Sequence, residues 1–345
     1  MAPGPRTVAL IATPPGPGGI AVVQVIGPGA RAAARRAGIK LSPAPAFSRL
    51  DDDVLACFRP ASDTPWKLPT VEVSCHGGTA APRALLARIG VPEATRTEVY
   101  DAAVARRALD RTSAEAWLLL PEARTWRATM MLLEQARGAL AKAVKNVKSP
   151  ADALRLLETA RAGRALVDPP TVVLAGRANA GKSTLLNALA GADRALVSDI
   201  PGTTRDPVAQ TVAFDGFPVR LVDTAGFAEG GDDLDRASMK LSREASCEAA
   251  LTLWVRDARE PSKTEGGLRV AAKMDLPGVR AARHEIPISA LTGRGLDRLR
   301  QAILRELGLA PLKGATVFTA RQEALLQALA AGGKARDVRE KLLWT

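Results

Sequence analysis

The sequence of 345 residues is poor in cysteine, histidine and aromatic residues, and it contains no long apolar run. Its three cysteines, Cys57, Cys75 and Cys247, are scattered and form no CxxC pair, which argues against a disulfide framework or a zinc site and fits a reducing compartment. The apolar run at residues 8–12 is too short for an export signal, and no stretch reaches the length of a membrane span. We therefore expect a cytoplasmic protein without a membrane partner.

Acidic residues are in the minority, because 36 Asp or Glu stand against 48 Lys or Arg and leave a net charge of +12. Residues 164–310 are nearly neutral, with 20 basic and 19 acidic residues, so the flanking segments hold 28 basic and 17 acidic residues. Such an excess suits a polyanion such as RNA, since basic side chains that contact phosphates release counterions. A solvated, arginine-rich surface explains the same excess equally well.

The periodicity of apolar residues predicts four stretches. Residues 1–92 predict a small α+β domain, with strands such as "AVVQVIG" and "TVEVSC" and short helices, whereas "LSPAPAF" and "PASDTPWKLP" predict loops. Residues 93–166 predict helices, because "ARGALAKAVKNVK" and "ADALRLLETARAGRAL" carry apolar residues at i, i+3, i+4 and i+7. Residues 167–310 alternate strand and helix signals, as a doubly wound α/β domain does, and residues 311–345 are helical again. The α/β domain is thus predicted to be inserted into a helical domain.

The strongest chemical motif is "GRANAGKS" at residues 176–183. It follows the apolar strand "TVVLA" and precedes "TLLNALAG", the context in which GxxxxGK[ST] indicates a phosphate-binding loop (P-loop) rather than a turn that only joins a strand to a helix. Backbone N–H groups and a helix N-terminus attract phosphates. We expect Lys182 to reach the β- and γ-phosphates and Ser183 to bind Mg²⁺, with further contacts from Asn179, Ala180, Gly181 and Thr184.

Two further segments follow at the distances expected for a nucleoside-triphosphate site. "VRLVDTAG" is a strand ending in Asp223, which would hold Mg²⁺ through water, and Gly226 can offer its N–H to the γ-phosphate. In "VSDIPGTTRD", Thr204 is the candidate switch threonine that completes the coordination of the metal. Taken singly, Asp223 or Thr204 would more often be an ordinary strand-end or turn residue. The prediction therefore depends on their occurring in this order after the P-loop.

"AAKMD" and "IPISALTGRG" are the candidate base-reading segments. The stem of Lys273 would cover the base, Asp275 would accept hydrogen bonds from the guanine N1–H and 2-amino groups, and Ser289 and Ala290 would close the far side. Adenine lacks that donor pair, so the carboxylate discriminates against it. Ala272 stands where such loops usually carry Asn or Thr, and we therefore expect weaker, faster-exchanging but still guanine-selective binding.

"GRANAGKSTLLNALAG", "DIPGTTRDPV" and "DTAGF" resemble the G domain of the MnmE (TrmE) tRNA-modification GTPases, and "VALIATPPGPGGIAVVQVIGPGA" and "VEVSCHGG" look like that family's amino-terminal domain. The resemblance implies a homodimeric GTPase that uses Mg²⁺ and is stimulated by K⁺. It also implies work with an MnmG-like flavoprotein and a tetrahydrofolate one-carbon unit on the wobble uridine of tRNA. Asn179 is the residue match for K⁺, and an asparagine that merely fits a tight turn is the alternative.

The sequence also departs from this family. Asp235 stands where the family carries the Glu that orients the attacking water, and Asp232, Asp233 and Glu229 are the alternatives, although such residues are more often solvated loop charges. Because Asp is one methylene shorter than Glu, a shift of about 1 Å in the position of the water is expected to slow hydrolysis on the order of a hundredfold. No Cys follows Cys247, although the family usually has a Cys-containing carboxy-terminal tail, and the family's "RGG" near the folate site is "PGG" here, so folate binding has weak support. The alternative function is a regulatory GTPase or RNA-assembly factor that has lost the modification activity. The short segment between "LTLWVRDAREP" and "AAKMD" predicts that one peripheral helix has shrunk to a loop.

Overall fold

The computed structural model describes residues 6–14, 16, 18–41, 45–50, 53–193, 209–223, 249–262 and 267–345. By its packing the chain divides into two units, Met1–Leu118 with Glu340–Thr345, and Leu119–Arg339. Among the described residues, no helix is both long enough and apolar enough to span a membrane. The candidate residues Thr204, Gly226 and Asp235 lie outside the described ranges.

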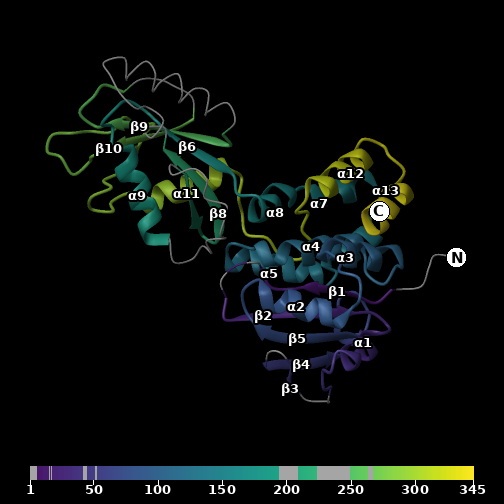
Figure 1. Ribbon diagram of the computed structural model, residues 1–345. Coiled ribbons are helices and arrows are strands. Elements are labelled where there is room, and N and C mark those ends of the chain that lie inside the picture. The colour runs from purple at the N-terminus through teal and green to yellow at the C-terminus, as the bar shows by residue number, and fades with distance from the viewer. Residues whose placement is uncertain are drawn as a thin grey trace. The chain divides into compact units, whose positions relative to one another are not determined.

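The first unit is built on a five-stranded antiparallel sheet, coloured purple to blue in Figure 1. Its strands, in spatial order, are β1 (Val8–Ile11), β2 (Ile20–Ile26), β5 (Thr70–His76), β4 (Asp53–Arg59) and β3 (Ala46–Arg49). Successive side chains of a strand point to opposite faces, so Ala9 and Leu10 belong to two different hydrophobic clusters. Helices α1 (Ala30–Arg36) and α2 (Ala80–Ile89) complete one cluster, and α3 (Arg96–Ala105) completes the other.

Three details of the first unit bear on the sequence predictions. The prediction of a loop at "LSPAPAF" is wrong for Ala46 and Phe47, which belong to the short edge strand β3. "CHGG" is a strand end followed by a tight glycine turn, because a Cβ on Gly77 would lie 1.7 Å from the carbonyl oxygen of Gly18. The second proline-rich stretch, "PASDTPWKLP", contains only the short 3₁₀ helix η1 (Ala61–Asp63).

The helices predicted between the two sheets form, but as shorter elements than the periodicity indicates. They are α4 (Arg111–Leu119), the 3₁₀ helix η2 (Leu120–Glu122), α5 (Trp126–Ala136), α6 (Ala139–Lys145), α7 (Pro150–Leu157) and α8 (Ala160–Val167). Gly138 separates α5 from α6 with φ 93°, a left-handed conformation that glycine adopts without a steric cost. A capping box of Ser149 and Asp152 starts α7.

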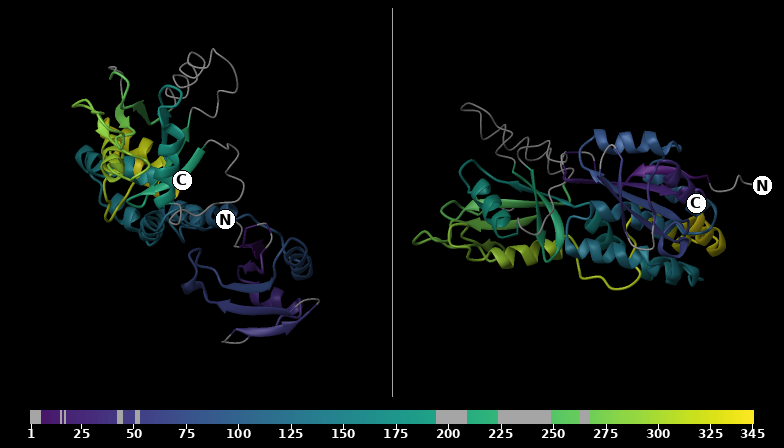
Figure 2. Two further views of the ribbon diagram at one scale, coloured as in Figure 1. Left: turned by 90° about the vertical axis from the view of Figure 1, so that its left-hand side faces the viewer. Right: turned by 60° about the horizontal axis from the view of Figure 1, so that its bottom comes forward.

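The chain returns to these helices after the second sheet. Helices α12 (Ala320–Ala330) and α13 (Ala335–Trp344) follow a connection that runs in yellow from α11 (Leu296–Glu306) in Figure 2. Helix α12 packs against α7, and Arg164 forms an ion pair with Glu323 at 2.9 Å. The buried amide of Gln135 donates to the carbonyl of Gly314 at 2.9 Å. Segments that precede and follow the second sheet in sequence therefore pack together within the second unit.

The second sheet has six strands and carries the candidate site. In spatial order they are β11 (Ile286–Pro287), β10 (Leu268–Ala272), β9 (Leu251–Asp257), β6 (Thr171–Ala175), β8 (Phe217–Asp223) and β7 (Ala209–Phe214). All neighbours are parallel except β7 and β8. Helices α9 (Lys182–Asp193) and α11 (Leu296–Glu306) pack against the sheet (Figure 1). The predicted α/β class, with a small sheet domain ahead of it, is confirmed.

Parallel pairing decides where the functional residues meet. The carboxyl ends of parallel strands lie at one edge of a sheet, and ligands bind there in open α/β folds. Leu174 of β6 pairs with Asp223 of β8, and Ala272 of β10 pairs with Asp257 of β9. Between β9 and β10, the described residues 258–262 and 267 form turns and loop without a helix, as the short spacing predicts.

Candidate nucleotide-binding site

The P-loop connects β6 to α9 through three residues with positive φ. Gly176 has φ 146°, and a Cβ there would lie 2.1 Å from the carbonyl oxygen of Val255 on the neighbouring strand, so only glycine fits. Gly181 has φ 98° and Asn179 has φ 59°. Ala180, between them, is buried. The sequence therefore folds here into a tight loop at the edge of the sheet, ahead of a helix N-terminus.

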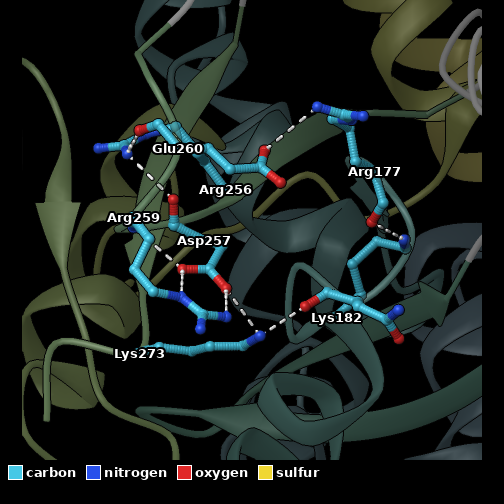
Figure 3. Close-up of polar contacts among 8 residues, drawn as sticks. Arg177, Lys182, Arg256, Asp257, Arg259, Glu260 and Lys273 are labelled. Carbon is cyan, nitrogen blue, oxygen red and sulfur yellow. Dashed lines mark hydrogen bonds and ion pairs between the residues drawn. The ribbon is translucent and has the colours of Figure 1, made fainter. Parts of the chain in front are cut away.

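Lys182, the first residue of α9, turns its side chain back into this loop. Its ammonium donates hydrogen bonds to the carbonyl oxygens of Gly176 and Arg177, each at 2.9 Å, and the residue is buried (Figure 3). These two bonds hold the lysine side chain across the P-loop. That position puts its charge inside the ring of backbone groups that a phosphate would enter.

Ser183 and Asp223 bring two hard oxygen donors together beside the P-loop. The Ser183 hydroxyl donates to Oδ2 of Asp223 at 2.5 Å, and Asp223 is buried at the end of β8. Thr184 follows on the exposed first turn of α9. Magnesium prefers hydroxyl, carboxylate and water oxygens, so this pair has the chemistry of a Mg²⁺ site next to phosphates.

The candidate base-reading residues also lie together. The Ser289 hydroxyl, which is buried, donates to Oδ1 of Asp275 at 2.7 Å, and it accepts a bond from the N–H of Thr292 at 3.2 Å. Ala290 follows Ser289 in the same turn, and Asp275 itself is exposed. One carboxylate oxygen of Asp275 is therefore fixed by protein, while the side chain stays accessible to a base.

Lys273 joins the base-reading segment to the P-loop. Its ammonium donates to the carbonyl oxygen of Asn179 at 2.6 Å, and its backbone has φ 62°. This contact spans 94 positions of sequence. An ideal Cβ placed on Gly181 would lie 3.8 Å from both Cε of Lys273 and Cβ of Ala272. The two loops are consequently in direct contact.

Asp257 is a residue at this site that the sequence predictions missed. Its buried carboxylate accepts from the ammonium of Lys273 at 2.8 Å and from three donors of Arg259, namely the backbone N–H and Nε at 3.0 Å and a terminal nitrogen at 2.6 Å (Figure 3). The Arg259 bonds hold the pKa of Asp257 well below its ordinary value, and those of Lys273 add to this against the effect of burial. The available signal was a carboxylate that ends the apolar strand "LTLWVRD", as Asp223 ends "VRLVD".

A second ionic contact joins strand β9 to the segment before β11. The guanidinium of Arg256 binds both carboxylate oxygens of Glu285, at 2.9 and 2.6 Å. The Ser262 hydroxyl and the N–H of Ala282 each donate to the same carboxylate at 2.8 Å. Burial raises the pKa of Glu285, but the bonds from Arg256, Ala282 and Ser262 outweigh it and lower the pKa to about 2. These bonds hold β9 and the short loop after it against the segment that precedes β11.

Comparison with known proteins agrees with this geometry. The family model described as 50S ribosome-binding GTPase matches residues 171–279, which contain the P-loop, Asp223 and the base-reading loop. The tRNA modification GTPase MnmE of Xanthomonas campestris is 34% identical over 369 residues, covering 90% of this chain and 82% of its own length. The protein of that name from Thermus thermophilus is 34% identical over 380 residues, covering 93% and 87%.

The chain belongs to the MnmE family. The resemblance seen in the sequence motifs is confirmed, and it extends over both sheets and the helices. Because the chain also carries the GTPase domain of this family, it is a GTP-binding and GTP-hydrolysing enzyme. Among the MnmE-like site residues, the structure brings together Asn179, Lys182 and Ser183 with Asp223, and it brings Lys273 and Asp275 to the same edge.

Proposed function

We propose that this MnmE-family protein hydrolyses GTP with Mg²⁺ at the edge of the second sheet and acts in the modification of tRNA wobble uridines. The observation that supports it best is the bond from Lys273 to the carbonyl of Asn179, because it joins the guanine-reading segment to the P-loop in one site. The names of the relatives, tRNA modification GTPases, support the substrate. The basic excess of the flanking segments is consistent with RNA as a partner.

The phosphates would lie on the N–H groups of residues 179–184, with the Lys182 ammonium neutralising charge on the β- and γ-phosphates. Ser183 and Thr204 would ligate Mg²⁺ directly, Asp223 would hold it through water, and Gly226 would contact the γ-phosphate. The metal would supply positive charge to the oxygens on which charge develops during hydrolysis. The adjacency of the Ser183 hydroxyl and the Asp223 carboxylate supports this assignment.

Asp235 is our proposal for the carboxylate that orients the attacking water. An Asp235→Ala variant is expected to lose at least about tenfold in turnover while it still binds GDP, since general base and positioning groups contribute on the order of a hundredfold or more. The matched control is Glu306→Ala, at an exposed acidic residue of α11 to which no role is assigned. Turnover unchanged by Asp235→Ala would remove the role.

Asn179 is proposed to contribute to a K⁺ site at the phosphates. Its φ of 59° also supports the simpler explanation, because asparagine tolerates left-handed turns better than most residues. Hydrolysis measured in KCl and in NaCl at equal ionic strength separates the two. Faster turnover in KCl that is lost in Asn179→Ala supports the ion, whereas equal rates in both salts eliminate it.

The modification activity needs a test of its own, apart from GTP hydrolysis. We propose a homodimer that works with an MnmG-like flavoprotein, with a tetrahydrofolate derivative as the weakest part of the proposal. The alternative is a regulatory GTPase or RNA-assembly factor that has lost the modification activity. Mass spectrometry of wobble uridines in a deletion strain decides between them. Loss of the modified nucleoside, restored by the wild-type gene, supports modification, and an unchanged nucleoside profile supports the alternative.

The domain layout also remains a proposal, with residues 1–92, 93–166, 167–310 and 311–345 as its parts. The packing of α12 against α7 supports an α/β domain inserted into a helical one. Expression of residues 167–310 alone tests it, since an autonomous domain would bind GDP without the remaining chain.

A further inference from the structure

Ala272, which gives the base-reading loop no polar side chain, lies opposite the carboxylate of Asp257 on the neighbouring strand. Ala272 is buried at the end of β10 and carries only a methyl group. Its register partner on the adjacent strand β9 is Asp257, which is also buried. A carboxylate therefore lies one strand away from the place where the sequence offers no polar group to fix the loop.

The carboxylate is directed at the neighbouring lysine. Oδ2 of Asp257 lies 2.8 Å from the ammonium of Lys273, and the same ammonium lies 2.6 Å from the carbonyl oxygen of Asn179 (Figure 3). The Lys273 stem meanwhile approaches Gly181 of the P-loop. Since the lysine is bonded to both β9 and the P-loop, its stem cannot swing away without breaking two charge-assisted bonds.

Arg259 keeps this carboxylate ionised and oriented. It occupies both oxygens of Asp257 through a bidentate contact, and its backbone N–H binds Oδ1. Its own side chain is 62% exposed, whereas that of Asp257 is 7% exposed. The arginine thus shields the aspartate from solvent and leaves Oδ2 aligned on Lys273.

We propose that Asp257 is a positioning residue that sets how long a guanine nucleotide stays bound, by holding Lys273 against the P-loop in place of the missing side chain at position 272. The inference rests on the proposed function, because it assumes that the Lys273 stem covers the base. Asp257 acts through Lys273 and does not itself contact the nucleotide. Selectivity for guanine, which depends on Asp275, is independent of it.

Dissociation of GDP carrying an N-methylanthraniloyl fluorophore on its ribose, chased with excess GDP, tests this role. Asp257→Asn keeps the shape but loses the charge, and we expect dissociation about tenfold faster with an unchanged ratio of GDP to ADP affinity. The control is Asp297→Asn, which removes the charge of a 95% exposed carboxylate that pairs with Arg300 on α11 and is expected to leave the rate unchanged. A rate in Asp257→Asn within twofold of wild type overturns the proposal.

The effect of Asp257→Asn in the Ala272→Asn background separates a positioning role from a merely structural one, because a structural role would give the same effect in both backgrounds. If an asparagine side chain introduced at position 272 does the same work as Asp257, Asp257→Asn should accelerate dissociation less than about threefold in the Ala272→Asn background, against about tenfold in wild type. Equal effects in both backgrounds overturn the proposal. If Asp257→Asn alone does not fold, Arg259→Gln, which removes the bidentate partner of the same carboxylate at an exposed side chain, takes its place in both backgrounds. Wild-type protein that binds no labelled GDP would instead overturn the proposed function itself.

Discussion

The Ser183 hydroxyl lies 2.5 Å from Oδ2 of Asp223, although 40 positions separate the two residues in the sequence. The contact follows from the parallel pairing of β6 with β8, which places the start of α9 and the end of β8 at the same edge. Two oxygen groups of the kind that Mg²⁺ prefers therefore lie side by side at this edge of the sheet.

Ser183→Ala should therefore impair metal use more than nucleotide binding. We expect the rate of GTP hydrolysis to fall about a hundredfold at about 1 mM Mg²⁺, because the loss of one group that stabilises the transition state typically costs that much. The rate should recover partly at high Mg²⁺, since a weakened metal site fills again as the metal concentration rises. A Mg²⁺ titration of the hydrolysis rate measures both effects. Ser62→Ala, at an exposed serine of the first unit, serves as the control. A titration curve that overlays the wild-type curve would exclude Ser183 as a ligand.

Lys182→Ala should abolish tight nucleotide binding. Its ammonium is the charged group inside the P-loop, and its loss is expected to weaken GDP binding at least about a hundredfold, as removal of a charge-assisted phosphate contact does. Titration calorimetry with GDP measures the change, and circular dichroism checks that the fold is kept. Lys313→Ala, on an exposed lysine, should bind as wild type does.

Ser289→Ala should lower the preference for guanine. The hydroxyl of Ser289 holds one carboxylate oxygen of Asp275. Without that hydroxyl the carboxylate is free to rotate, and ordering it again on binding would cost free energy. We expect GDP to bind about tenfold more weakly while the weak binding of ADP stays as it was. Competition against labelled GDP gives both constants. Equal losses for GDP and ADP would mean that Ser289 supports the fold rather than base recognition.

Ala272→Asn should tighten binding of GDP. The substitution restores the amide that such loops use to bond the base and the P-loop, and Ala272 Cβ already approaches the P-loop at Gly181. A gain of about 1 kcal/mol, or roughly fivefold in affinity, is expected for one hydrogen bond. The result is measured by calorimetry, with Ala272→Val as the control that adds volume but no polar group. Weaker binding in Ala272→Asn than in wild type would contradict the account.

The ion pair of Arg256 and Glu285 predicts a loss of stability in acid. The pKa of Glu285 falls from 4.5 to about 2 in the folded chain. A carboxyl group with a lowered pKa in the folded state contributes its full stability at any pH above its pKa in the unfolded state. That contribution is lost as the pH falls through the pKa of the folded state, here between about pH 5 and pH 2. The contribution is on the order of 3 kcal/mol at neutral pH. Denaturant unfolding of wild type and Glu285→Gln should show the variant less stable at pH 7 and the gap closing toward pH 3. Glu306→Gln, at an exposed glutamate, should follow wild type at both pH values.

Much of the fold was predictable because its signals are local. The apolar strand "TVVLA", the glycines of the P-loop and the carboxylate at the end of "VRLVD" each define a neighbourhood within a few residues, and the structure forms β6, α9 and β8 there. Helix ends were less predictable. Gly138 lies inside a continuous helical pattern, yet its left-handed backbone divides that pattern into α5 and α6.

The candidate site was predictable only in the parts that occur as contiguous motifs. Asp257 escaped prediction because its importance arises from pairing between strands, which places it opposite Ala272, and from two cations that approach it from different loops. The Arg256–Glu285 pair escaped for the same reason, since 29 positions separate its partners. No spacing rule along the chain reports such a contact, whereas the register of the parallel sheet places Asp257 opposite Ala272 and thus next to Lys273.

The affinity of the wild-type chain for GDP and for ADP, measured side by side by calorimetry in Mg²⁺, tests the central claim most directly. The account predicts that GDP binds at least about a hundredfold more tightly than ADP, because Asp275, held by Ser289, would accept the two donors of guanine, and Lys273, held at the P-loop, would cover the base with its stem. Equal affinities for the two nucleotides would contradict it.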